Sequence, residues 1–253
     1  MRVVIALGGN AILRRDEEPL IEVQRRNVRI AARAVAEVAQ EHTVVVTHGN
    51  GPQVGLLAAW ALDTGGTPIH PLDVVGAESM GMIGYLLAQE LSNQIPNKQV
   101  ATLLTRVEVR ADDPAFHEPT KPIGPVLTEE EAQELAGRHG WSFAPEGAHY
   151  RRVVPSPHPV RILEAQTICK LVDEGVLLVC GGGGGIPVQV GENGSFLGVE
   201  AVIDKDRTAG LLAHILGADA LLLLTDVPAQ QAAWGSPDAR PIGETTPSEL
   251  REL

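Results

Sequence analysis

The sequence contains little cysteine and no long apolar run. Cys169 and Cys180 are the only cysteines, too few for a disulfide framework and without the paired spacing of a zinc site. No stretch approaches the run of about 18 apolar residues that a membrane helix requires, and Met1 leads directly into an apolar segment without the charged head of a signal peptide. These absences predict a soluble cytoplasmic protein with two reduced structural thiols and no membrane partner.

Positive charge is also in short supply. Lysine and arginine total 20 against 32 aspartates and glutamates, which gives a net charge of -12. A surface of this sign repels a phosphate backbone, so nucleic acid is not expected as a partner. A chain of this charge that acts on small phosphorylated substrates must hold them with a few well-placed lysines and with backbone N–H groups.

Apolar runs alternate with amphipathic stretches along the chain. The apolar runs have the length and bounding glycines of buried strands, and helical spacing lies between them. Such alternation predicts right-handed βαβ crossovers and an α/β protein around a mainly parallel sheet. The predicted strands are 3–7, 43–47, 99–105, 176–180 and 220–225, and the predicted helices are 28–40, 76–92 and 162–173.

Two segments interrupt this alternation. Four prolines in 112–125 leave little regular hydrogen bonding and predict a projecting loop or small lid, with a short helix starting at a capping box on Thr128. A hairpin is predicted around Glu192–Ser195. We expect a lid subdomain over about 110–152 within an N-terminal lobe, 1–160, followed by a C-terminal lobe, 161–253.

The C-terminal residues have the pattern of a helix start. Thr246 is a cap residue, Pro247 suits the first helical position, and Glu249 suits the third. Only about one turn follows, which is too short to nucleate well or to bury a useful face. We therefore expect the natural domain to continue beyond Leu253 and the C-terminal lobe to be incomplete.

Three glycine loops follow predicted strands. They are Gly8-Gly9-Asn10, the string from Thr47 to Gly55 that includes Asn50-Gly51, and five consecutive glycines from Gly181. Glycine at the carboxyl end of a parallel strand lets the backbone approach an anion closely, and a following helix N-terminus favours negative charge. The loops predict anion binding, whereas His48 is interpreted as a structural histidine without a catalytic role.

A charged triplet, Asp204-Lys205-Asp206, precedes the predicted helix 208–216. Taken alone, such a triplet is more often a solvated helix cap. A lysine held by carboxylates can also be aimed at the oxygens of a phosphoryl group in transfer, where charge stabilisation supplies nearly all of the catalysis. Beside three anion-binding loops, the second interpretation is favoured.

Six strings, in order and over nearly the whole chain, together resemble the carbamate kinase family of the amino-acid-kinase fold. The resemblance implies a three-layer αβα sandwich with a small proline-rich lid. It also implies reversible phosphoryl transfer, ATP plus carbamate giving ADP plus carbamoyl phosphate, in a homodimer that uses Mg²⁺ and often runs in the ATP-forming direction in arginine or allantoin catabolism. The strings occupy residues 4–10, 48–55, 119–125, 150–157, 180–187 and 198–206.

The same resemblance implies roles for individual residues. Lys205 would neutralise charge between donor and acceptor, Asp204 would orient it, and Lys121 on the lid would close over the phosphoryl group. The N-terminal lobe would bind carbamate and the phosphoryl group and the C-terminal lobe the nucleotide, with Mg²⁺ carried by the nucleotide and no metal ligands from the protein. The implied phosphoryl- and substrate-binding residues are Gly8, Gly9, Asn10, Asn50, Gly51, Gly182 and Gly183, and the implied nucleotide-binding residues are Asp206, Thr225, Asp226 and Val227.

Two departures from the family pattern leave alternatives open. The family continues past the position of Leu253 with a loop that carries a second phosphoryl-clamping lysine, and after Val227 it has a less interrupted run. One alternative is another acyl-phosphate-forming enzyme of the same fold with a different small acid acceptor, and a second is a weakly active or non-catalytic ligand-binding homologue. A Rossmann-type dehydrogenase is disfavoured, because no Gly-x-Gly-x-x-Gly follows the first strand.

Overall fold

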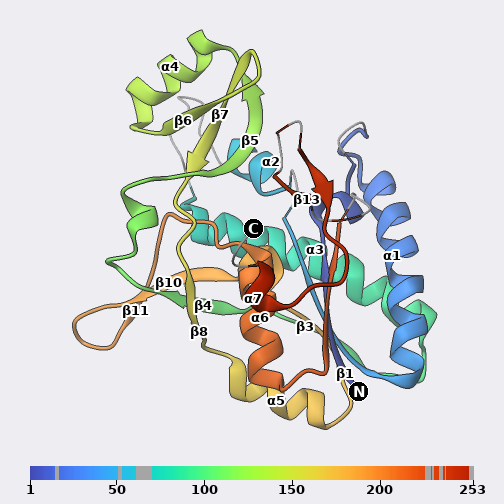
Figure 1. Ribbon diagram of the computed structural model, residues 1–253. Helices are drawn as coiled ribbons and strands as arrows, with labels where there is room; N and C mark the ends of the chain where they lie inside the picture. Colours follow the sequence, from blue (N-terminus) through green and yellow to red (C-terminus); the bar gives the residue numbers. More distant parts are fainter. Residues whose placement is uncertain are drawn as a thin grey trace.

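The computed structural model describes residues 1–14, 17–50, 53–60, 70–225, 229, 231–233, 236 and 238–250. Within this part of the chain, the central sheet has the strand order β12-β1-β2-β9-β3 (Figure 1). Every neighbouring pair in it is parallel, which confirms the prediction from alternating apolar runs. The strands are β1 (Arg2–Leu7), β2 (Thr43–His48), β3 (Val100–Leu103), β9 (Leu177–Cys180) and β12 (Ala220–Leu224).

Helices cover both faces of this sheet. Alternate residues of β1 point to opposite sides, so that Ile5 packs into one buried core with side chains of α1 and α3, and Ala6 packs into another with side chains of α5 and α6. Burial on both faces explains why the strands are apolar runs without alternation. The three-layer αβα sandwich is therefore confirmed (Figure 1). The helices are α1 (Ile21–Glu41), α3 (Leu72–Gln94), α5 (Ala165–Asp173) and α6 (Lys205–Leu216).

A second sheet has the order β11-β10-β4-β8 among the described strands. Its β10 and β11 form the predicted hairpin, in which the Gly191 amide donates to the Ser195 carbonyl at 2.8 Å. The predicted helix 162–173 is wrong at its start, because Ile162 ends β8, is buried, and pairs with Val107 of β4. The strands are β4 (Arg106–Val109), β8 (Pro159–Ile162), β10 (Ile186–Val190) and β11 (Phe196–Gly198).

A small subdomain, called the lid below, stands on the body of the molecule (Figure 1). It is an antiparallel sheet in the order β5-β7-β6, built from β5 (Lys121–Leu127), β6 (Ser142–Glu146) and β7 (His149–Val154). The prolines of 112–125 had predicted a projecting loop or small lid; the segment does enter the lid, but as strand β5 from Lys121 onward. An edge strand pairs on one side only and tolerates proline, and the register of β5 shifts between Ile123 and Val126.

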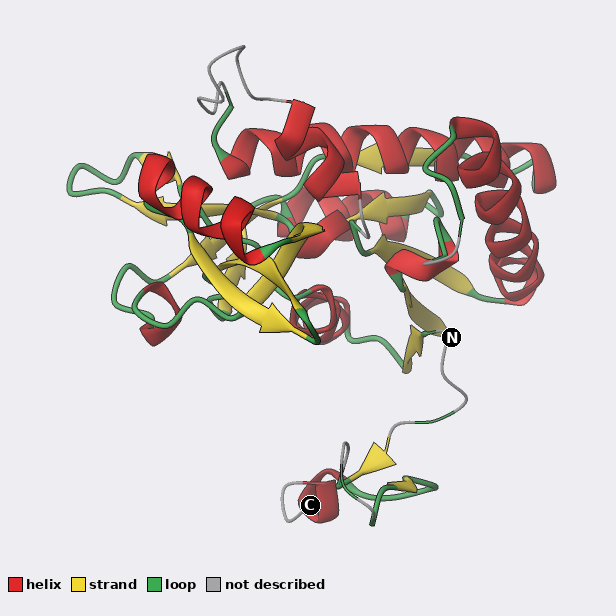
Figure 2. Cartoon of the chain, turned by 90° about the horizontal axis from the view of Figure 1, so that it is seen from above, coloured by secondary structure: helices red, strands yellow, loops and turns green. Residues whose placement is uncertain are grey.

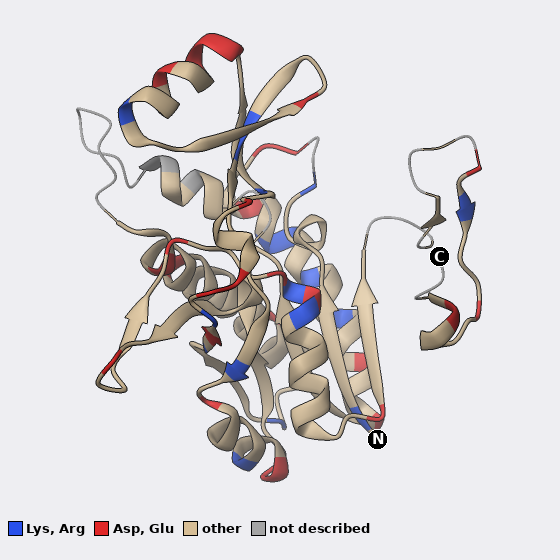
Figure 3. Ribbon diagram, turned by 60° about the vertical axis from the view of Figure 1, so that its left-hand side comes forward, with Lys and Arg blue, Asp and Glu red and all other residues tan. Residues whose placement is uncertain are grey.

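Helix α4 (Glu129–His139) crosses the lid sheet and has the start that the sequence predicts. The Thr128 hydroxyl accepts from the Glu131 amide at 3.3 Å, and the Glu131 carboxylate accepts from the Thr128 amide at 2.8 Å. Acidic residues fill the first turn and basic residues the last, an arrangement that suits the helix dipole (Figure 3). Gly140, with φ of 68°, ends the helix.

The C-terminal residues form short elements that stand apart from the sheet (Figures 2 and 3). They are β13 (Gln231–Ala232), β14 (Arg240–Pro241) and α7 (Pro247–Leu250), which follows the predicted cap at Thr246. Leu222, Leu223 and Leu224 of β12 are 39%, 46% and 41% exposed. The lobe boundary near residue 160 stays a prediction, since the central sheet takes strands from both sides of it. None of the helices described is long and apolar enough to cross a membrane.

Candidate active site

The three glycine loops meet at the carboxyl ends of β1, β2 and β9, as expected for adjacent parallel strands. The Gly8 amide donates to the Leu224 carbonyl at 2.9 Å, and the Gly49 amide donates to the Leu7 carbonyl at 2.8 Å. A Cβ atom on Gly49 would lie 3.1 Å from the Gly9 nitrogen. The first two loops therefore pack closely backbone to backbone, and a side chain at Gly49 would require Gly9 to shift.

The five-glycine loop packs directly against the second loop. A Cβ atom on Gly182 would lie 2.2 Å from His48 Nε2, and one on Gly183 would lie 1.7 Å from Asn50 Oδ1. Gly183 also has a φ of +65°, a conformation that L side chains rarely adopt. These glycines are thus required because side chains of the neighbouring loop occupy the space, and a flexible linker does not explain them.

His48 is buried beneath these loops, with 1% of its surface exposed. Its Nδ1 lies 3.0 Å from the Gly49 carbonyl oxygen. Burial lowers the pKa of His48 to about 4, although the contact with Gly49 acts in the opposite direction. The imidazole is therefore neutral at pH 7, which agrees with the structural role expected of it.

Asp204 caps α6 and also binds the lid. Its Oδ1 accepts from the Asp206 amide at 2.9 Å, and its Oδ2 accepts from Lys121 Nζ at 2.7 Å. Partial burial opposes ionisation of Asp204, but the hydrogen bond and charge of Lys121 and the amides of the helix start hold its pKa below the usual value. The carboxylate is ionised at neutral pH and joins the first residue of β5 to the start of α6.

Lys205 lies beside the glycine loops at the first position of α6. Its Cδ atom is 3.4 Å from the position of a Cβ on Gly49, and its Nζ donates to Asp206 Oδ1 at 2.5 Å. The resemblance had implied that Asp204 orients Lys205. That role stays a prediction. In the structure, Asp204 Oδ2 accepts from Lys121 Nζ and Asp206 Oδ1 accepts from Lys205 Nζ.

Two cavities open onto these residues, and Gly9, Lys205 and Asp206 line both. The first, here called the lid cavity, has a volume of about 330 Å³ and lies under Lys121. The second, here called the β12 cavity, has about 570 Å³ and reaches the end of β12. The lid cavity is lined by Gly9, Gly49, Asn50, Val54, Lys121, Pro122, Ile123, Gly183, Val202, Ile203, Asp204, Lys205 and Asp206. The β12 cavity is lined by Gly8, Gly9, Asn10, Ala11, Arg14, Lys205, Asp206, Leu223, Leu224 and Thr225.

Most of the predicted site residues therefore come together, and a few do not. Gly182 packs on His48 and lines neither cavity. Three predicted residues, Gly51, Asp226 and Val227, lie outside the residues that the structure describes. Sequence reasoning missed Arg14 in the β12 cavity. A single arginine in a loop after a glycine pair belongs to no motif, so its position alone gave no signal.

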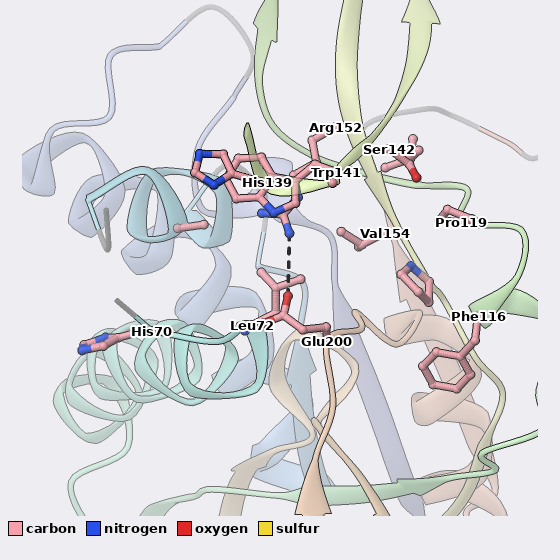
Figure 4. Close-up of a pocket in the computed structure, with 14 residues that line it drawn as sticks. His70, Leu72, Phe116, Pro119, His139, Trp141, Ser142, Arg152, Val154 and Glu200 are labelled. Atoms are coloured by element: carbon pink, nitrogen blue, oxygen red, sulfur yellow. Dashed lines mark hydrogen bonds and ion pairs between the residues drawn. The ribbon is translucent and has the colours of Figure 1, made fainter. Parts of the chain in front are cut away.

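A third hollow of about 550 Å³ separates the lid from the body (Figure 4). Inside it the guanidinium of Arg152 on β7 lies 3.7 Å above the Trp141 ring and 3.7 Å from the Glu200 carboxylate. Glu200 in turn accepts from the Leu72 amide at the start of α3, at 2.8 Å. Burial lowers the pKa of Arg152 to about 10 against the opposing charge of Glu200, so the group remains a cation at pH 7. This chain of contacts ties the lid to α3.

Comparison with known proteins agrees with this geometry. A model of the amino acid kinase family matches residues 1–253. The chain is 51% identical over 254 residues to a carbamate kinase of Haemophilus influenzae, covering 100% of this chain and 82% of that protein, and 51% identical over 256 residues to one of Rhizobium meliloti, covering 100% and 79%. It is also similar to the structure of a carbamate kinase from Giardia lamblia bound to AMP-PNP, with a TM-score of 0.82, 42% identity, and coverage of 95% of this chain and 78% of that one. The chain belongs to the amino acid kinase family and, within it, to the carbamate kinases.

Proposed function

We propose that the two cavities joined by Lys205 hold the two substrates of a carbamate kinase, so that a phosphoryl group passes between ATP and carbamate past the Lys205 ammonium. The observation that carries the proposal is that Lys205 lines both cavities. In phosphoryl transfer, negative charge spreads over the oxygens between donor and acceptor, and a fixed cation at that point stabilises the transition state.

The β12 cavity is the proposed nucleotide site. Its floor contains the Gly8 to Asn10 loop, whose backbone can approach phosphates closely, and its far wall contains the partly exposed Leu223 and Leu224. Such a cavity offers polar backbone to a polyphosphate and an apolar surface to a base. The AMP-PNP bound to the Giardia relative supports a nucleotide in this family.

The lid cavity is the proposed site of carbamate and of the phosphoryl group that it receives. Lys121 supplies a cation from the lid, and Gly183 and Gly49 allow close approach of the backbone. Asn50 Oδ1 is buried and has no hydrogen-bond partner among the described residues. The amino group of carbamate is a donor of the kind that this oxygen lacks, whereas acetate offers no such group. Contact between this oxygen and the amino group would favour carbamate over a simple carboxylic acid.

Mg²⁺ is part of the proposal as an ion that arrives on the nucleotide. The part of the chain that the structure describes contains no cluster of three or more His, Cys, Asp or Glu side chains suited to a metal ion. The Asp206 carboxylate lines both cavities and supplies the oxygen that such an ion prefers. Bound there, the ion would neutralise polyphosphate charge.

The proposal also includes a pathway, a location and an oligomeric state. They are the ATP-forming direction in arginine or allantoin catabolism, a cytoplasmic location, and a homodimer built around a continuous sheet. The arrangement of β3 at one end of the described central sheet is compatible with such a dimer. The proposal keeps the lobe assignments, 1–160 for carbamate and 161–253 for nucleotide, with residues of both lobes lining each cavity.

A coupled assay tests the function. The protein is supplied with MgADP and, in separate reactions, with carbamoyl phosphate, acetyl phosphate or N-acetylglutamyl phosphate, and ATP is measured through hexokinase and glucose-6-phosphate dehydrogenase. We expect ATP from carbamoyl phosphate and a large loss in Lys205→Ala. Comparable ATP from acetyl phosphate would favour an enzyme with another acceptor. Calorimetric binding of carbamoyl phosphate without turnover would favour a ligand-binding homologue.

A further inference from the structure

Arg14 lies in the loop that follows the Gly8-Gly9-Asn10 turn and is one of the residues that line the β12 cavity. Among the described residues, no carboxylate forms an ion pair with its side chain. We propose that Arg14 is a second cationic contact for the nucleotide phosphates, in addition to Lys205. The inference rests on the proposed function in one respect, namely that the nucleotide occupies the β12 cavity. It adds a binding residue that no motif in the sequence had indicated.

Both lysines of the site are neutralised by carboxylates, so binding of a polyphosphate calls for a further positive charge. Lys121 is paired with Asp204 at 2.7 Å and Lys205 with Asp206 at 2.5 Å, so each pair carries no net charge. The whole chain has a net charge of -12, which gives a polyphosphate no general attraction. The Arg14 guanidinium, which forms no ion pair with the other described residues, supplies positive charge at this cavity.

The backbone that carries Arg14 is held in place by Glu17. The Glu17 carboxylate accepts from the Arg14 amide at 3.1 Å, from Arg26 Nη2 at 2.6 Å and from Asn27 Nδ2 at 2.5 Å. Asn27 is buried on α1, so the loop is fastened to the body of the protein. Because the nearby carboxylate is occupied by these donors, the Arg14 guanidinium remains available while its backbone is positioned.

The chemistry of the side chain fits the assignment. A guanidinium is planar, and its array of N–H groups can donate two parallel hydrogen bonds to a phosphate. A contact of this kind is made both before and during transfer. It is therefore expected to contribute to nucleotide binding more than to the rate of the chemical step.

Calorimetric titration with ADP tests the assignment on wild-type protein, Arg14→Ala, Arg14→Lys and the control Arg33→Ala, which removes an exposed positive charge from α1. A charge-assisted contact predicts that Arg14→Ala weakens ADP binding by about tenfold to a hundredfold and that Arg14→Lys falls in between. Arg33→Ala should bind ADP within about twofold of wild type, as a surface charge far from the ligand contributes little. Adenosine, followed by NMR titration, should bind wild type and Arg14→Ala equally.

Three results would overturn the inference. Unchanged ADP affinity in Arg14→Ala would remove Arg14 from the nucleotide site while leaving the proposed function intact. An equal loss of ADP and adenosine affinity would show that the residue shapes the loop and does not contact phosphate. A wild-type chain that binds no ADP at all would overturn the proposed function and this inference together.

Discussion

Replacing Gly183 by alanine tests whether the five-glycine loop holds Asn50 in the lid cavity. Gly183 has φ of +65°, and a Cβ there would lie 1.7 Å from Asn50 Oδ1. Gly194, in the β10–β11 turn, provides a matched control, since it has φ of +72° and open space where its Cβ would be. An alanine in the left-handed region costs about 1 to 2 kcal/mol at either position. Only the Gly183 variant adds a collision with a site residue.

The size of the functional effect follows from what Asn50 must do. A Cβ at 1.7 Å forces the Asn50 side chain to rotate away from its place beside the loop. Loss of one preorganised polar group in an active site costs about 3 kcal/mol, near a hundredfold in rate. We therefore expect kcat/KM for carbamoyl phosphate to fall by about a hundredfold in Gly183→Ala and to change by less than about twofold in Gly194→Ala.

Steady-state ATP formation and thermal unfolding, measured on the same preparations, separate activity from stability. Asn50→Ala and the double variant Gly183→Ala/Asn50→Ala complete a double-mutant cycle. If Gly183→Ala acts through Asn50, adding it to Asn50→Ala should lower kcat/KM little further. If Gly183→Ala folds and has the same kcat/KM as Gly194→Ala, then the alanine is accommodated without moving Asn50 and the reasoning fails.

Further predictions concern the lysines, the buried histidine and the lid contact. Lys205→Ala should lower kcat by about a hundredfold or more with a smaller effect on KM, and an unchanged kcat would remove it from the mechanism. Lys121→Ala should also raise the KM for carbamoyl phosphate, because a lid residue assists capture; an unaffected KM would count against this. Burial lowers the pKa of His48 from 6.5 to about 4, so between these pH values the unfolded chain binds a proton that the folded chain does not. About 3 kcal/mol of the free energy of unfolding present at neutral pH should therefore be lost on reaching pH 4. Urea unfolding of His48→Gln should lack that part of the pH dependence. Arg152→Ala should change the fluorescence of Trp141 in a variant whose other tryptophans are phenylalanine, and identical spectra would argue against their stacking.

The parts of the fold that could be predicted are those fixed by local pattern. Strands β1, β2 and β9 could be predicted because a strand that is buried on both faces is a continuous apolar run in the sequence. Strand β5 was missed, because Pro122 and Pro125 argue against a strand unless its position at a sheet edge is known. That position depends on pairing with β7, which the local sequence does not reveal.

In the candidate site, too, residues in local motifs could be predicted, and contacts between distant parts of the chain could not. The glycine loops and Lys205 could be found from sequence, because close approach of backbone to an anion requires glycine after a strand. The partner of Asp204 could not, because Lys121 comes from 83 residues away in the chain. Arg152, Trp141 and Glu200 are ordinary residues in sequence, and only the packing of the lid on α3 brings them together.

The contact between Lys121 and Asp204 has a consequence for selectivity. In the absence of substrate the carboxylate acts as an internal competitor, occupying the lid lysine that a phosphoryl group would otherwise reach. A phosphoryl group that binds Lys121 would have to displace this carboxylate, and with two negative charges it would interact more strongly with the cation than the carboxylate does. We therefore expect the lid contact to favour a doubly charged phosphoryl group.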